Sequence, residues 1–215
     1  MQPRTSRRIE AALLRASTKA YQDASAAQFV LPPRALADHL VGRFFERVFY
    51  LYPVFHRQSF ESAYHRLWEP AASGTSLPRE PSPVFVGLGS SPQTGPESLV
   101  FHCALNAIFA LGCQFSDWSG LNAESTALTF FLRSKSLLGI EFLESNTTGV
   151  VQALLIITLY LQSTPFPGRC WKSIGIACRL AQGMGLHIET RSTVRSSLET
   201  DMRRRIWQGC VVLDM

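Results

Sequence analysis

The sequence lacks the residue patterns on which the common catalytic and metal sites depend. It contains no Cys-x-x-Cys pair and no His-Glu-x-x-His motif, and the glycine-rich stretch Gly87-Leu-Gly89-Ser90 is followed by no Gly-Lys-Ser/Thr. These absences exclude the usual zinc frameworks and the phosphate-binding P-loop, because each needs its ligands at a fixed spacing. No run of alternating apolar and polar residues is long enough to require a sheet, so we predict an all-α fold.

Cysteine is scarce, and its distribution argues against disulfide bonds. The five cysteines are Cys103, Cys113, Cys170, Cys178 and Cys210, an odd number, and most of them lie in apolar segments. A disulfide framework uses cysteines in pairs, usually in a small secreted protein. We therefore expect reduced, buried cysteines in an intracellular protein.

Charged residues make up only 17% of the chain, which indicates that the helices bury much of their surface against one another. The formal charge is +5, and most of the excess lies near the amino terminus. There, six basic residues face two acidic ones, a balance of +4: Arg4, Arg7, Arg8, Arg15, Lys19 and Arg34 against Glu10 and Asp23. We predict a basic, partly disordered arm over residues 1–32. It is either a solvated start to the chain or a contact for nucleic acid or an acidic protein surface.

Long hydrophobic runs are missing as well. The most apolar stretch, Val150–Leu161, is too short to cross a bilayer. The apolar patch Ile9–Leu14 is too short for a secretory signal. The sequence therefore predicts a protein with no membrane partner.

Helical periodicity accounts for most of the remaining chain. A Pro-, Gly- and Ser-rich stretch at 70–97 predicts a long surface loop between the helices. Thr94-x-x-Glu97 and Ser196-x-x-Glu199 match capping boxes at the start of two helices. The last helix reaches Met215 with no stop signal. We expect an irregular multi-helix domain over residues 33–215 that is shortened at its C-terminus.

The best-defined helix lies between Arg169 and His187. It can begin at Pro165 or Pro167, and Gly185 followed by Leu186 is typical of a left-handed C-terminal stop. Its apolar residues repeat every three to four positions and predict one buried stripe: Cys170, Trp171, Ile174, Ala177, Cys178, Ala181 and Met184.

Two histidine pairs are candidate catalytic groups. His56 stands three residues before Ser59, and His102 adjoins Cys103. Neighbouring residues on a helix point about 100° apart, so the second pair is a poor dyad. We expect no enzyme activity.

The run Arg203-Arg204-Arg205 suggests a basic site at first sight. On a helix the three side chains fan out by about 200° and form no single stripe. Glu199 and Asp201 each lie four residues before an arginine of the run, the favourable order for helical ion pairs. We interpret the arginines as structural or interface residues, with a nucleic-acid patch as the alternative.

Several motifs of the second half together resemble a known family. They are Leu154–Gln162 with Tyr160, Trp171-x-x-x-Gly175-x-Ala177-x-Arg179-x-Ala181-Gln182-x-x-Gly185-Leu186-His187, and Glu199-x-x-x-Arg203-Arg204-Arg205-x-Trp207 with Asp214. This combination resembles the fungal-specific transcription factor domain, the middle homology region of regulators with a binuclear zinc cluster. Tyr52-Pro53-Val54-Phe55-His56-x-x-x-Phe60 is similar to the family's amino-terminal signature. The resemblance covers about Pro33 to Met215.

The resemblance implies a regulatory domain of a nuclear, sequence-specific transcription factor. The family binds DNA through a separate Cys-x-x-Cys-x6-Cys cluster with two zinc ions, and this sequence contains no such cluster. We therefore expect no cofactor in this chain and no specific DNA binding by it alone. The resemblance further implies protein partners of the transcription machinery and a small-molecule effector.

The same resemblance makes Trp171, Gly175, Arg179, Gly185, Leu186 and His187 scaffold positions. In this interpretation Gly175 permits a close helix approach, Arg179 pairs with an acid on a neighbouring helix, and His187 bonds a backbone carbonyl. The alternative function is a helical effector-sensing or protein-interaction module. Its expected apolar pocket lies between the Phe44/Phe45 helix and Val150–Leu161.

Overall fold

The computed structural model describes residues 29–69, 86–119, 122–139, 147–188 and 195–215. The chain divides into two units, Met1–Pro33 and Arg34–Met215, and the second contains all of the helices discussed below. Most of the predicted basic arm, residues 1–28, lies outside the described residues. In the part of the chain that is described, every regular element is helical, which confirms the all-α prediction.

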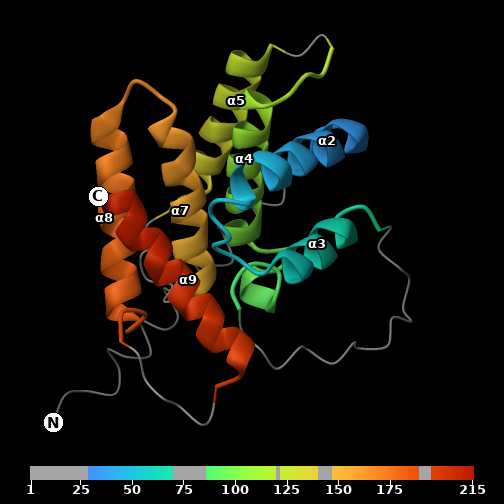
Figure 1. Cartoon of the computed structure of the whole chain (residues 1–215). Coiled ribbons are helices and arrows are strands. Elements are labelled where there is room, and N and C mark those ends of the chain that lie inside the picture. The colour runs from blue at the N-terminus through green and yellow to red at the C-terminus, as the bar shows by residue number, and fades with distance from the viewer. Residues whose placement is uncertain (1–28, 70–85, 120–121, 140–146, 189–194) are drawn as a thin grey trace, which may run out of the picture. The chain divides into compact units, whose positions relative to one another are not determined.

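The described elements are a series of helices and short helical turns (Figure 1). They are α2 (Arg34–Phe44), the π-helical turn η1 (Phe45–Phe49), α3 (Arg57–Arg66), the 3-10 turn η2 (Pro92–Thr94), α4 (Leu99–Gln114), α5 (Ala123–Ser136), α7 (Thr148–Gln162), α8 (Pro167–Gly183) and α9 (Ser197–Asp214).

Two apolar helices, α4 and α7, form the centre of the domain. Every residue from 100 to 113 and from 149 to 161 is buried. A helix that is apolar all round must be covered on all sides. Accordingly α2, α5 and α7 pack on α4, while α8 and α9 pack on α7 (Figure 1). The stretch Pro92–Gln114 is long and apolar enough to span a membrane, but 78% of its most apolar window is buried, as in a core helix.

The predicted 70–97 loop is only partly a surface segment. Residues 70–85 lie outside the described residues, whereas Val86 and Leu88 are buried in the core. Gly87 and Gly89 have φ values of +97° and +81°, a conformation that favours glycine. The side chain of Thr94 donates to the Gly87 carbonyl at 2.6 Å and closes the segment into a compact turn. Residues 86–91 are irregular, as a loop would be, but the predicted surface position is wrong for Val86 and Leu88, whose apolar side chains anchor the turn.

The proposed capping box at Thr94-x-x-Glu97 is also wrong. Ser98 caps α4 instead, and its hydroxyl accepts a hydrogen bond from the Phe101 N–H at 3.1 Å. Thr94 is bonded within the preceding turn and is not available to the helix. The second predicted box starts α9 as expected, since Ser196 accepts from the Glu199 N–H at 3.1 Å.

A buried glutamine holds the 86–90 turn against α7. The Gln152 side chain is fully buried, and its Oε1 accepts a hydrogen bond from the Leu88 N–H at 2.8 Å. Its Nε2 donates to the Val86 carbonyl at 3.0 Å. The amide thus pairs one backbone donor and one acceptor that would otherwise be buried without partners.

An aromatic cluster joins α2, η1 and α3 to the core. The ring centroids of Phe55 and Phe60 lie 5.0 Å apart, and Phe60 stacks on Phe101 of α4 at 5.2 Å. Phe44 stacks on Phe55 at 6.1 Å with nearly parallel planes. The motif that resembles the family's amino-terminal signature therefore supplies side chains to the core.

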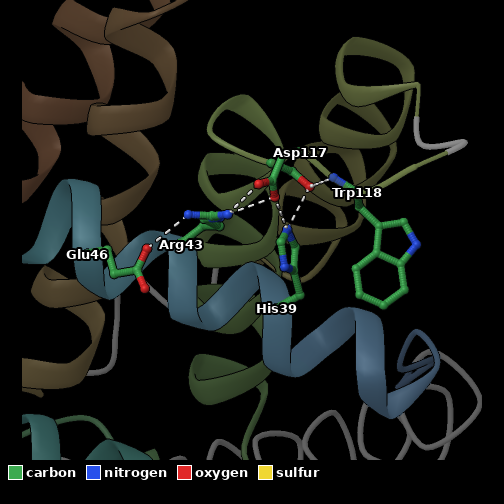
Figure 2. A network of polar contacts seen from close by, with 6 residues as sticks. His39, Arg43, Glu46, Asp117 and Trp118 are labelled. Atoms are coloured by element: carbon green, nitrogen blue, oxygen red, sulfur yellow. Dashed lines mark hydrogen bonds and ion pairs between the residues drawn. The ribbon is translucent and has the colours of Figure 1, made fainter.

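A polar network fixes α2 to the connection between α4 and α5 (Figure 2). Arg43 donates to both carboxylate oxygens of Asp117 at 2.7 Å and to Glu46 at 3.1 Å. His39 Nε2 lies 3.5 Å from Asp117, and its ring meets Trp118 edge-on at 5.1 Å. The guanidinium holds the pKa of the Asp117 carboxyl below its usual range, so this link is present at neutral pH.

The pocket predicted between α2 and α7 stays a prediction. The α2 helix packs on α4, and a Cβ added to Gly112 would lie closer than 3.0 Å to the Leu40 carbonyl. A concave surface of about 340 Å³ lies between α2, η1 and α3. It is lined by Asp38, Val41, Gly42, Phe45, Glu46, Arg57, Glu61, Tyr64 and His65, none of them from α7.

Candidate functional site

Most of the residues that carried the sequence resemblance fall on α8, on the turn that follows it and on α9. These two helices pack against each other and against α7 (Figure 1). We call α8, residues 184–188 and α9 the signature helices. Their contacts separate the residues that build the fold from those that face outward.

The end of α8 has the predicted left-handed stop. Gly185 has a φ of +65°, and its N–H donates to the Gln182 carbonyl at 2.9 Å. The Leu186 N–H reaches back to the Ala181 carbonyl at 2.9 Å, and the Leu186 side chain is buried. These two bonds form a Schellman motif, in which glycine avoids the steric cost of a positive φ.

Arg203 of α9 closes the same helix end. Its guanidinium donates to the Gly185 carbonyl at 2.9 Å and to the Met184 carbonyl at 3.3 Å. A cation at this position also interacts favourably with the partial negative charge of a helix C-terminus. Arg203 therefore links the two signature helices, which the sequence alone did not indicate.

The predicted ion pairs of the arginine run are half correct. Arg205 lies 2.7 Å from Asp201, as expected, whereas Glu199 lies 3.5 Å from Arg195 instead of pairing with Arg203. The expected Glu199–Arg203 pair is wrong because the α8 carbonyls hold the Arg203 guanidinium. Arg204 is exposed.

His187 and Trp207 form a further contact between the two helices. Their ring centroids lie 5.6 Å apart with the planes tilted by 53°. The sequence predicted a bond from His187 to a backbone carbonyl, and the structure places its ring against the indole instead. The scaffold role of the two residues stays a prediction.

Three signature residues face outward, contrary to their predicted scaffold roles. Trp171 is 70% exposed, although the apolar periodicity placed it on the buried stripe. A Cβ added to Gly175 would meet nothing within 4 Å, so this glycine serves no close helix approach within the domain. Arg179 donates to Gln182 of its own helix at 3.3 Å, not to an acid on a neighbouring helix. The buried stripe consists of Ser173, Ile174, Ala177 and Ala181.

The profile of one protein family matches residues 41–215, which include both signature helices and most of the remaining helices. Its description is fungal-specific transcription factor domain. The chain belongs to this family. The matched residues include the aromatic cluster around Phe55 and Phe60 as well as the signature helices.

Transcription regulators of fungi are among the similar curated proteins. Sorbicillinoid biosynthetic cluster transcription factor 2 of Penicillium rubens is 28% identical over 188 residues, which cover 86% of this chain and 25% of that protein. The lactose regulatory protein of Kluyveromyces lactis is 30% identical over 117 residues, 54% of this chain and 13% of that protein. Cutinase transcription factor 1 alpha of Fusarium vanettenii is 26% identical over 185 residues, 83% of this chain and 17% of that protein.

The chain spans a quarter or less of the length of these curated relatives. No solved structure was found to match it. The fungal transcription factor domain described here is therefore one part of what its relatives contain.

Tyr160, the remaining signature residue, belongs to the core of this domain. Its ring stacks on Phe131 of α5 with centroids 4.8 Å apart, and the side chain is buried. Burial raises the pKa of its hydroxyl, which stays protonated at neutral pH. Tyr160 is a packing residue that joins α7 to α5.

The two histidine pairs have structural partners. His56 caps α3, and its Nδ1 lies 2.8 Å from the Ser59 hydroxyl and 3.3 Å from the Ser59 N–H. His102 Nε2 lies 2.7 Å from the Pro96 carbonyl, whereas the Cys103 thiol contacts Ser134. Burial raises the pKa of Cys103 to about 12, so its thiol is not ionised at neutral pH. His102 and Cys103 thus point to different neighbours.

Metal ligands do not gather in the part of the chain that the structure describes. Within these residues no group of three or more His, Cys, Asp or Glu side chains is placed to hold an ion. The five cysteines lie on α4, α8 and α9, and all are free thiols.

Sequence reasoning missed two residues whose side chains bond to distant backbone groups, Gln152 and Arg203. Gln152 lies within an otherwise apolar helix, and a polar side chain there must find a buried partner. The last carbonyl groups of α8 have no partner within the helix and need hydrogen-bond donors, which Arg203 of α9 supplies. Each signal says that a partner is required, but neither says which backbone groups supply it.

Replacing Arg203 by methionine is expected to lower the free energy of unfolding by about 2 kcal/mol, since hydrogen bonds from a charged donor contribute about 1.5–3 kcal/mol. Urea unfolding followed by circular dichroism measures the change. The matched control is Arg205→Met on the same helix, where loss of an exposed helical pair costs about 0.3–0.5 kcal/mol. Equal effects of the two substitutions would contradict the linking role of Arg203.

Proposed function

We propose that this chain is a regulatory, non-catalytic domain of a fungal transcription factor that acts in the nucleus. The observation that carries the proposal is the family match over residues 41–215. The similar proteins from Penicillium and Fusarium bear the names of transcription factors, which supports the same role here. A small-molecule effector stays a prediction.

The histidines and cysteines support a non-catalytic role. His56 serves as a helix cap, and His102 is bonded to a backbone carbonyl. Burial raises the pKa of the Cys113 and Cys210 thiols to about 12, so neither supplies a thiolate nucleophile at neutral pH. Each of these groups has a structural explanation.

The family's zinc cluster does not fit the cysteines of this chain. The cluster needs cysteines in Cys-x-x-Cys-x6-Cys spacing, whereas no two cysteines of the sequence lie within three positions of each other. Those of the structure are spread over three helices. We therefore propose that these 215 residues supply neither zinc ligands nor base-specific DNA contacts.

The proposal is tested by fusing the chain to an unrelated DNA-binding domain that recognises a reporter promoter. We expect the fusion to change reporter output relative to the DNA-binding domain alone, because a regulatory domain acts when it is brought to a promoter. A matched fusion that carries Phe60→Ala removes a fully buried core side chain and is expected to abolish the effect.

Two results would contradict the proposal. Reporter output that is the same with and without the domain would remove the regulatory role. A sequence-specific, salt-resistant complex between the purified chain and DNA would contradict the proposal that these residues supply no base-specific DNA contacts. The basic arm alone predicts only salt-sensitive, sequence-independent contact.

A further inference from the structure

The outward face of α8 carries large apolar side chains that the described part of the domain leaves exposed. Trp171 is 70% exposed and Ile176 40%. Phe166, the residue before the helix, is 48% exposed. A tryptophan that is 70% exposed leaves a large apolar surface in water. Tryptophan is among the residues that contribute most to binding at protein interfaces, so its exposure suggests a surface that a partner covers.

A glycine lies beside this tryptophan on the same face. Trp171, Gly175 and Arg179 are spaced four residues apart and therefore follow one side of the helix. Glycine inside a helix is destabilising relative to alanine, and a Cβ at Gly175 would meet open space, so no internal contact explains the glycine. Its effect is to leave room over the helix backbone next to the exposed indole.

The charge of α8 is of one sign. The helix contains Arg169, Lys172 and Arg179 and no acidic residue. Among the described residues these cations make no ion pair: Arg169 lies over the Phe166 ring at 4.3 Å, and Arg179 bonds to Gln182. By contrast, Arg57 of α3 and Arg205 of α9 each have a carboxylate partner.

We propose that the outward face of α8 is a docking surface for an acidic amphipathic segment of a partner protein. An apolar side chain of the partner covers the Trp171 indole in the space above Gly175. Carboxylates of the partner pair with Lys172 and Arg179. One occupant then provides apolar contacts for the exposed apolar side chains and carboxylate partners for the cations.

The charge argues against two other occupants. A second copy of this chain would place the same three cations against each other, and like charges oppose such an interface. Nucleic acid would neutralise the cations but would leave Trp171 and Ile176 without apolar partners. An acidic, partly apolar peptide matches the whole face.

The test uses the full purified chain and a set of fluorescein-labelled peptides of 18 residues. Each peptide has leucine or phenylalanine at i, i+3, i+4 and i+7 and glutamate at most other positions. Fluorescence anisotropy measures binding. We expect saturable binding of the acidic peptides and none of versions with the same composition in scrambled order or with lysine in place of glutamate.

Variants of the face are expected to weaken this binding without unfolding the protein. Trp171→Ser and Gly175→Gln should each raise the dissociation constant at least tenfold, the first by removing the apolar contact and the second by filling the space beside it. Gly175→Gln should leave the melting temperature unchanged or higher, since glutamine favours helix and its side chain meets open space. Lys172→Glu combined with Arg179→Glu should abolish binding of the acidic peptides and permit binding of the lysine versions.

Two control variants make the same chemical changes elsewhere. Gly42→Gln also extends into open space but lies on α2, and Lys135→Glu reverses an exposed charge on α5. Both should leave the dissociation constant within twofold of the original. Control variants that weaken binding as much as the α8 variants would overturn the assignment of the surface.

Three further results would also overturn the proposal. The first is that no acidic peptide binds. The second is that duplex DNA or anionic lipid vesicles bind through Trp171 and Lys172 while the peptides do not. The third is a dimer of the chain that Trp171→Ser dissociates. The inference rests on the proposed function only because a regulatory domain needs a partner. The peptide assay does not use the reporter, so the docking surface and the regulatory function can each fail while the other holds.

Discussion

Replacing Gln152 by leucine is expected to lower the free energy of unfolding by about 3 kcal/mol, because a buried backbone group left without its partner costs about 1–3 kcal/mol. Leucine fills the space of the glutamine but leaves the Leu88 N–H and the Val86 carbonyl unpaired in the core. Urea unfolding monitored by circular dichroism at neutral pH measures the change. Hydrogen exchange should also speed up at the Leu88 amide.

Thr158→Val on the same helix is the matched control. Thr158 is fully buried; its hydroxyl donates to the Leu154 carbonyl at 2.8 Å and lies 2.9 Å from the Ser173 hydroxyl. Valine has the same shape, and the Leu154 carbonyl keeps its helical partner, so the expected cost is only about 1 kcal/mol. If Gln152→Leu is no more destabilising than this control, the turn at 86–90 does not depend on the amide.

Acidification from pH 7.5 to pH 4.5 is expected to remove about 2.5 kcal/mol of stability through His102 alone, since one pKa unit corresponds to about 1.4 kcal/mol. Burial lowers the pKa of His102 from 6.5 to about 4, although its hydrogen bond to the Pro96 carbonyl acts in the opposite direction. Below pH 6.5 the unfolded chain therefore binds a proton at His102, whereas the folded protein binds this proton only below about pH 4. The stability is fully present above pH 6.5 and is lost as the pH falls through this window.

His102→Gln separates this effect from the titration of carboxylates. The glutamine amide can donate to the Pro96 carbonyl but does not titrate. Unfolding by urea at pH 7.5 and at pH 4.5 should show a smaller pH-dependent loss for the variant than for the original protein, by about 2.5 kcal/mol. Equal losses in the two proteins would show that His102 is not protonated on unfolding.

Sequence reasoning succeeded where the cause of a structure lies within a few residues. Gly185 and Leu186 end α8 as predicted, because a left-handed residue and its two backbone bonds are local. Ser196 caps α9 for the same reason. The burial of α4 also has a local cause, since a helix that is apolar all round can only be buried.

The same reasoning failed where two local signals competed or where a face had no unique partner. Thr94 has the chemistry of a helix cap, but the turn around Gly87 uses its hydroxyl and leaves the cap to Ser98. Periodicity placed Trp171 at the edge of the buried stripe of α8. Packing against neighbouring helices sets the rotation of α8 about its axis. In that rotation Ser173, Ile174, Ala177 and Ala181 are buried, and Trp171 is exposed.

The sequence by itself determined the all-α class, the position of the signature helices and the family resemblance, because periodicity, caps and motif spacing are properties of the chain. Only the tertiary structure decided that Gln152 holds the 86–90 turn and that Arg203 closes the end of α8. It also decided that Trp171, Gly175 and Arg179 face outward. The physical reason is that a long-range hydrogen bond, or the exposure of one helix face, depends on which elements pack together. No local pattern contains that information.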